Sequence, residues 1–231
     1  RRQRILDAAF LLSGRYGMDK VTVEDVAREA GISKGAVYLE FPNKEAIFDT
    51  VVQHHLSGQL DALQAHWQAF LAEGGAGAPS VPDALAEALT AHVLRVFDCA
   101  SEHFHSMDVM LYMSHWIRTR CPEYFQRYED AIAAYLAEAQ ARGELPPDRS
   151  PVDDARLILV AMGGLFPPYK PVREPGAAPD GLPSRPYLEA TARQLLAVLL
   201  AGLRASSGVE LSAFRGDHGL APRLRGGFAP Q

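Results

Sequence analysis

Residues 22–38 read TVEDVAREAGISKGAVY, and this stretch predicts two short helices joined by a tight turn. Thr22 is a favourable N-cap residue, and Asp25 follows it at the spacing of a capping box. Gly31 adopts left-handed backbone without steric cost and so closes the first helix. Ser33 then caps a second helix. Two helices at this spacing are typical of a helix-turn-helix.

The second helix has the residue types that a nucleic-acid reader needs. Its exposed side begins with Lys34, Gly35 and Ala36, which are basic or small, and continues with Tyr38, which is aromatic. Such a surface can approach a phosphate backbone closely and enter a major groove. A generic three-helix module is the alternative, but it requires neither the Lys-Gly-x-x-Tyr run nor the Phe-Pro-x-Lys-Glu run at residues 41–45.

From about Arg4 to Val52, the sequence resembles the DNA-binding domain of the TetR family of bacterial transcriptional repressors. The match extends over roughly fifty positions in residue type, order and spacing, far beyond a short motif. The residues that carry it are Ile5, Ala8, Ala9, Leu12, Tyr16, Gly17, Thr22, Val26, Ala27, Ala30 to Ser33, Gly35, Val37, Tyr38, Phe41 to Glu45, Ile47 and Phe48.

The resemblance implies roles for individual positions. Tyr38 and Lys44 match residues that contact phosphate in the family, and Thr22 matches a phosphate-contacting hydroxyl position. The positions closest to the base edges are Lys34, Gly35, Ala36 and Leu39. The family's function implies a ligand-responsive homodimer on double-stranded DNA, which would read a palindromic operator.

Glu40 departs from the family pattern, which usually has an aromatic residue or histidine there. A carboxylate near phosphate repels it unless the side chain pairs with a base amine or a nearby arginine. This departure favours an alternative function, a helical protein-interaction adaptor whose DNA binding is lost or degenerate.

Charge is unevenly distributed along the chain. The formal net charge is −5, but residues 1–45 are nearly balanced and the excess of acidic residues lies beyond them. Arg1, Arg2 and Arg4 are either an N-terminal arm that reaches phosphate or the minor groove, or the solvated start of a helix. Because the sequence does not begin with methionine, we expect further residues upstream of this arm.

Helical periodicity without strand-like alternation predicts an all-α protein. We expect a DNA-binding domain at residues 1–48, a larger effector-binding and dimerisation domain at 49–205, and a disordered tail at 206–231. Asn43 should cap a long helix that ends near residue 72. Further helices are expected at 82–100, 103–119, 122–142, 151–166 and 187–203. Residues 167–186 contain seven of the sixteen prolines and should form an irregular loop.

Two of these helices are apolar over a broad face. The helices at 151–166 and 187–203 each have more apolar surface than one side of a small bundle requires, so we expect one stripe to face the core and another to face a second subunit. The alternative is that both fill the core of a monomer. The predicted interface residues are Leu157, Val160, Ala161, Leu195 and Leu199.

The middle of the larger domain is rich in aromatic and sulfur-containing side chains. A pocket for an apolar or aromatic effector needs such surface with a few polar groups, and methionine adapts to varied shapes. Ordinary core packing is the alternative for each residue. The predicted pocket residues are Phe97, Phe104, Met107, Met110, Met113, Trp116, Tyr128 and Phe166.

Other classes of protein are disfavoured by the sequence. It contains no Gly-rich phosphate loop, nucleophile elbow or HExxH motif, so we expect neither an enzyme nor a cofactor. His103 and His105 would lie on different helix faces, so no metal site is expected. We find no signal peptide or membrane-length apolar run and expect a cytoplasmic protein. Cys99 and Cys121 should be reduced, although a helix start at Cys121 would favour a thiolate.

Overall fold

A computed structural model of the chain describes residues 1–72, 79–102, 105–121, 123–167, 169, 174–176 and 182–205, and within these ranges it is helical without strands. The predicted all-α class is therefore confirmed. The predicted tail at 206–231, together with His103 and Phe104, lies outside the described residues. The helices are α1 (Arg2–Tyr16), α2 (Val23–Glu29), α3 (Lys34–Tyr38), α4 (Lys44–Ala72), α5 (Val81–Ser101), α6 (Ser106–Arg120), α7 (Glu123–Ala141), α8 (Pro151–Met162) and α9 (Arg185–Ala205), with a 3-10 turn, η1 (Gly163–Leu165), after α8.

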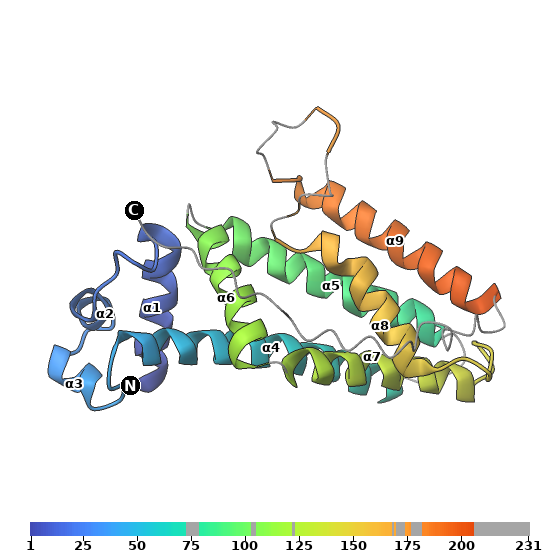
Figure 1. The fold of residues 1–231 in the computed structure, drawn as a ribbon, viewed down its shortest axis with the longest axis horizontal. Coiled ribbons are helices and arrows are strands. Elements are labelled where there is room, and N and C mark those ends of the chain that lie inside the picture. Colours follow the sequence, from blue (N-terminus) through green and yellow to red (C-terminus); the bar gives the residue numbers. More distant parts are fainter. Residues whose placement is uncertain are drawn as a thin grey trace, which may run out of the picture.

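Helices α1 to α3 and the first turns of α4 share one hydrophobic core. The side chains that are almost completely buried in it include Ile5 of α1, Val37 of α3, Phe41 in the connection before α4, and Ile47 of α4. This cluster extends along α4 as far as Val51. Figure 1 shows the three short helices grouped at one end of the molecule, with α3 farthest from the other helices.

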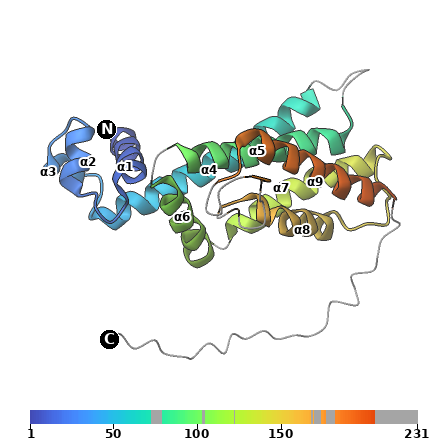
Figure 2. The same ribbon diagram turned by 90° about the horizontal axis from the view of Figure 1, so that it is seen from above.

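Helix α4 joins this end to the rest of the protein. Its 29 residues span roughly 43 Å at the rise of an α-helix. The predicted cap is confirmed, because Asn43 Oδ1 accepts a hydrogen bond from the Ala46 amide at 2.8 Å. The helix packs against α1 near its start and against α5, α6 and α7 farther along, so it belongs to both parts of the molecule (Figures 1 and 2).

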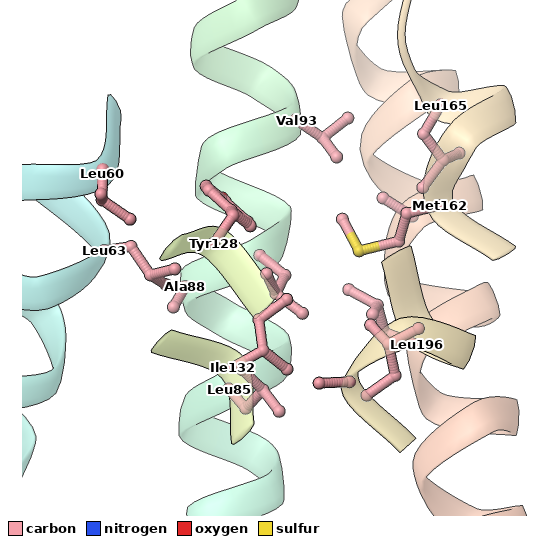
Figure 3. Close-up of a cluster of buried hydrophobic side chains, with 14 of the residues drawn as sticks. Leu60, Leu63, Leu85, Ala88, Val93, Tyr128, Ile132, Met162, Leu165 and Leu196 are labelled. Atoms are coloured by element: carbon pink, nitrogen blue, oxygen red, sulfur yellow. The ribbon is translucent and has the colours of Figure 1, made fainter. Parts of the chain in front are cut away.

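Helix α5 runs through the centre of the larger domain. It contacts α4, α6, α7 and α9, while α8 packs against α7 and α9. Figure 3 shows the resulting core, in which Leu85 of α5, Ile132 of α7 and Leu196 of α9 meet. These three side chains are completely buried, which places the largest hydrophobic cluster of the chain here.

Three element boundaries differ from the prediction. The helix expected at 151–166 ends at Met162, where Gly163 and Gly164 tighten the chain into a 3-10 turn. The last helix begins at Arg185 instead of residue 187, because Pro186 is tolerated in a first turn that lacks amide partners. Helix α6 begins at Ser106 instead of residue 103.

Candidate nucleic-acid interface and the larger domain

Local capping fixes the two helices of the helix-turn-helix. The Thr22 hydroxyl accepts a hydrogen bond from the Asp25 amide at 3.2 Å, and the Asp25 carboxylate accepts one from the Thr22 amide at 3.1 Å. Ser33 Oγ accepts from the Ala36 amide at 3.2 Å at the start of α3. Gly31, with a φ of 64°, makes the left-handed turn between them. The predicted caps and turn are confirmed.

The Thr22 hydroxyl is engaged more fully than the sequence indicated. It also donates to Asp25 Oδ2 at 2.6 Å, and its hydrogen bonds lower the pKa of the Asp25 carboxyl. A DNA phosphate would therefore compete with Asp25 for the hydrogen of Thr22. The predicted phosphate contact at this position remains a prediction.

Helix α3 presents an exposed face at the end of the molecule. Val37 is completely buried, whereas Tyr38 and Leu39 expose 49% and 80% of their surfaces. Lys34 and Gly35 are also exposed, and Ala36 is half-buried. The structure thus brings the predicted base-reading residues and Tyr38 onto one short helix and its C-cap, away from the larger domain (Figure 2).

The two predicted DNA-facing lysines make weak local contacts. Lys34 Nζ lies 3.2 Å from Glu24 Oε2, and both side chains are largely exposed. Lys44 Nζ donates to the Asp19 carbonyl at 3.2 Å and lies 5.7 Å from the centre of the Phe48 ring. Exposed pairs of this kind contribute little to stability, so a phosphate can replace them at small cost.

The N-terminal arginines contact the helix-turn-helix instead of extending away from it. Arg4 donates to the carbonyls of Ala30 and Gly31 at the end of α2. Arg2 donates to the Glu40 carbonyl at 3.1 Å, with its guanidinium 4.2 Å from the centre of the Phe41 ring. Of the two alternatives for these residues, the structure shows the helix start, with both guanidinium groups placed against the helix-turn-helix.

The same contacts give Glu40 a partner. Its carboxylate lies 3.7 Å from the Arg1 guanidinium. Sequence reasoning allowed for such a pairing with a nearby arginine but did not identify Arg1. The carboxylate beside α3 is therefore partly compensated by a positive charge.

Most predicted pocket residues are packed into the core of the larger domain. Phe97, Met110, Met113, Trp116 and Tyr128 are buried, and Met107 and Phe166 are half-buried. The rings of Tyr128 and Phe166 lie 4.9 and 5.3 Å from the ring of His92, which the sequence had not singled out. The structure thus brings two predicted residues together around a buried histidine.

A small cavity of about 90 Å³ lies between the two parts of the protein. It is lined by Phe10, Leu11 and Gly14 of α1, by Cys99 and Glu102 at the end of α5, and by Val109 and Met110 of α6. Met110 is its one member among the predicted pocket residues. The α1 residues were not predicted to line a cavity, because their helical periodicity indicated only that they pack in the core of the N-terminal helices.

Polar contacts tie α6 to the start of α4. Trp116 Nε1 donates to Asp49 Oδ1 at 2.8 Å, and Arg120 donates to Asp49 Oδ2 at 2.9 Å. Asp49 lies between Phe48 and Val51, whose side chains belong to the DNA-reading end. A movement of α6 would therefore act directly on the turn of α4 that supports α1 to α3.

Helices α8 and α9 expose apolar side chains. Leu157 and Val160 are 44% and 78% exposed, while Ala161, Leu195 and Leu199 are half-buried. Val198 of α9 is 66% exposed and was not among the predicted interface residues. An apolar surface of this kind is typical of a protein interface.

The described cysteines and histidines do not gather at one site in the fold. In the described part of the chain, no three His, Cys, Asp or Glu side chains are grouped so that they could hold a metal ion. Burial raises the pKa of the Cys99 thiol. Burial, together with a hydrogen bond to Glu123, also raises the pKa of Cys121, so the expectation of a favoured thiolate there is wrong.

Among the described helices, none is long and apolar enough to cross a membrane.

Comparison with known proteins agrees with the geometry of the helix-turn-helix. Residues 5–51 match the family model described as "Bacterial regulatory proteins, tetR family". This part of the chain is a TetR-family domain. The matched residues coincide with the first hydrophobic core, which runs from Ile5 to Val51.

Relatives match this chain over part of its length. The uncharacterized HTH-type transcriptional regulator YerO of Bacillus subtilis is 30% identical over 64 residues, which cover 28% of this chain and 22% of YerO. The A-factor receptor protein of Streptomyces griseus is 26% identical over 162 residues, covering 70% of this chain and 52% of the receptor. The matches thus span between about a fifth and half of these relatives' lengths.

The fold is shared with solved TetR-family structures across the chain. FadR from Bacillus subtilis, solved in complex with stearoyl-CoA, superposes with a TM-score of 0.60 at 17% identity, covering 87% of this chain and 99% of FadR. At this identity the likeness concerns the fold alone.

Proposed function

We propose that this TetR-family protein is a homodimeric, cytoplasmic repressor that leaves a palindromic operator when a small, largely apolar or aromatic effector binds its larger domain. The observation that carries the proposal is the exposed face of α3, where Tyr38 and Leu39 project from a capped helix at the end of the molecule. A short helix held in this way by a helix-turn-helix is suited to entering a major groove.

The apolar surface of α8 and α9 supports the dimer. The helix-turn-helix of one subunit covers only half of a palindromic operator. A symmetric dimer would place its two α3 helices about 34–36 Å apart, which is one turn of DNA. Val160 and Val198 supply apolar surface that a monomer would leave in water. A second copy of the same surface would bury it in an isologous interface.

The α4 contacts support release by an effector. The dimer can have one conformer in which the distance between its two α3 helices fits DNA and another in which it does not. An effector that binds the second conformer more tightly lowers the affinity for DNA, by an amount set by its difference in affinity for the two conformers. The link from Trp116 and Arg120 to Asp49 offers a route from α6 to the reader. Two similar proteins, the A-factor receptor protein and FadR in complex with stearoyl-CoA, favour a small-molecule effector.

Replacement of Tyr38 tests the DNA contact. Tyr38→Ala should weaken binding to operator and unrelated DNA alike by about 1 kcal/mol, because it removes a phosphate contact without base information. Phe125→Ala is the matched control, since Phe125 is 50% exposed on α7 of the larger domain. Fluorescence anisotropy with both DNAs measures the effect. Equal affinities for Tyr38→Ala and the unchanged protein would contradict the assignment.

Lys44 is tested through salt dependence. Lys44→Ala should reduce the slope of log affinity against log salt by about one, because one fewer phosphate counterion is displaced. Titrations of the same duplex at several salt concentrations give this slope. An unchanged slope would remove Lys44 from the interface.

Glu40 favours a second candidate, an interaction adaptor with degenerate DNA binding. The carboxylate adjoins the exposed face of α3, although Arg1 lies 3.7 Å away. The adaptor predicts weak DNA binding at low salt that does not depend on sequence. The repressor predicts a clear preference for one palindrome, so the same titrations distinguish the two.

A further inference from the structure

A buried polar group lies in the apolar centre of the larger domain. His92 of α5 is buried, and its Nδ1 lies 3.2 Å from Gln59 Oε1, which also accepts a hydrogen bond from Arg95 at 3.3 Å. An amide oxygen only accepts, so the proton of His92 is on Nδ1. Burial lowers the pKa of His92 to about 3. The ring is therefore neutral near pH 7, with Nε2 as a hydrogen-bond acceptor.

Two buried tyrosines along α5, of which Tyr128 lies beside this histidine, have unused hydroxyls. Tyr128 and Tyr169 are each 3% exposed, and neither hydroxyl has a hydrogen-bond partner among the described residues. The Tyr128 ring lies 4.9 Å from His92, and Figure 3 shows Tyr128 in the core near Leu60 and Leu63 of α4. Buried hydroxyls in folded proteins nearly always have partners, because burial without a hydrogen bond is unfavourable.

Aromatic side chains surround the same stretch of α5. The centre of the Phe166 ring lies 5.3 Å from the centre of the His92 ring. Phe97 follows His92 farther along α5, and the centre of its ring lies 6.0 Å from that of Tyr169. The Tyr169 amide donates to the Phe166 carbonyl at 2.9 Å, in a turn where Tyr169 has a φ of 54°. A β-carbon makes this conformation unfavourable, so the turn is held by its surroundings.

We propose that His92 and Tyr128 bind the hydroxyl of a neutral aromatic alcohol or phenol, whose ring lies against Phe166 and the neighbouring aromatic residues. This inference rests on the proposed effector function and specifies the chemistry of the effector. A hydroxyl donates one hydrogen bond and accepts others, which matches the acceptor Nε2 of His92 and the free hydroxyl of Tyr128.

A carboxylate fits this site poorly. A charged group in an apolar core is unfavourable unless an opposite charge pairs with it. Arg95 acts electrostatically on Tyr128, but its Nε already donates to Gln59. The Nη groups of Arg95 keep further N–H donors, so tighter binding of an anionic ligand would mean that they pair with it.

Three probes of the same ring system test the ligand class. At pH 7, 2-naphthol is neutral, 2-naphthoate is an anion, and naphthalene has no polar group. Titrations followed by tryptophan fluorescence, with thermal unfolding as a second readout, should show 2-naphthol binding about tenfold more tightly than either other probe, as expected for one additional hydrogen bond in an apolar site. Tighter binding of 2-naphthoate, or no detectable binding of 2-naphthol, would overturn the proposal.

Two tyrosine variants make the test specific to Tyr128. Tyr128→Phe should keep or raise the melting temperature without ligand, because it removes an unpartnered hydroxyl. It should also reduce the preference for 2-naphthol over naphthalene severalfold, leaving the part that the hydrogen bond to His92 supplies. Tyr135→Phe is the matched control on α7. Its hydroxyl lies 3.1 Å from His66 Nδ1, so its loss should lower the melting temperature and leave the preference for 2-naphthol unchanged.

Failure of this inference is distinguishable from failure of the proposed function. An undiminished preference for 2-naphthol in Tyr128→Phe would overturn the role of Tyr128, whatever the protein does with DNA. Conversely, specific 2-naphthol binding without any change in DNA affinity would support the ligand class and contradict release by the effector. The binding titrations require no DNA, so the two results are obtained independently.

Discussion

Neighbouring residues at the end of α3 differ in burial and therefore in the role that we expect for them. Val37 anchors the helix in the first core, while Tyr38 and Leu39 leave that core and project outward. The sequence predicted this division because an apolar residue inside a capped helix and an aromatic one beside it form a recognisable local pattern. By contrast, His92, Gln59 and Arg95 lie far apart in the sequence, and only folding brings them together.

The buried His92 predicts a pH dependence of stability. The folded-state pKa is lowered from 6.5 to about 3 by burial, so below pH 6.5 the unfolded chain takes up a proton that the folded protein resists. Stability should fall as pH decreases from about 6.5 to about 3, with a loss on the order of 2 kcal/mol at pH 5 from this residue. The lowered pKa of His55 acts in the same direction.

Urea unfolding at pH 7 and pH 5 measures this effect. His92→Gln should unfold with a smaller difference between the two pH values than the unchanged protein. His54→Gln, which alters an exposed histidine one position before His55, is the control and should retain the part of the difference that His92 causes. Identical pH dependence in His92→Gln and the unchanged protein would show that His92 is protonated with little cost in the fold.

At the scale of elements, capping residues made the helix starts predictable. Thr22, Ser33 and Asn43 cap the helices that follow them, because their side chains satisfy amides only two or three residues away. The break after Met162 was not predicted, because two glycines alone do not reveal how tightly the next turn must wind. The contacts of Asp49 with α6 were also missed, since no local signal marks a long-range acceptor.

Replacement of two glycines by alanine, one after α2 and one inside α4, should change the stability of the protein in opposite directions. Gly31→Ala should destabilise the protein by about 1 kcal/mol or more, because its φ is 64° and an added β-carbon would lie 3.0 Å from the Arg4 guanidinium. Gly58→Ala should stabilise it by roughly 0.5–1 kcal/mol, because this position is inside a helix with open space around it. Chemical unfolding measures both. Equal effects would contradict the left-handed turn at Gly31.

At the scale of the whole molecule, two hydrophobic cores share one long helix. The first core ends at Val51 and the second begins at Val52, so α4 passes from one to the other without a linker. The N-terminal core was predictable from a dense local pattern. The placement of the predicted pocket residues was not, because the sequence does not distinguish a side chain that lines a ligand site from one that packs in the core.

The exposed apolar face predicts an interface that charge should disrupt. A Val160→Asp substitution should convert a dimer to monomers, because it would bury two carboxylates against each other, and should weaken operator binding strongly. Leu111→Asp on α6, where Leu111 is 42% exposed, is the matched control and should remain dimeric. Sedimentation velocity measures the mass. A Val160→Asp protein of unchanged mass would place the interface elsewhere.

The most direct test of the central claim is selection of genomic DNA fragments from the source organism by the purified protein at moderate salt, followed by sequencing of the retained fragments. The account predicts enrichment of one palindromic site whose half-sites are about one helical turn apart, and loss of that enrichment in Tyr38→Ala. Retention of no site above background, or the same enrichment in Tyr38→Ala, would contradict a regulator that reads DNA through α3.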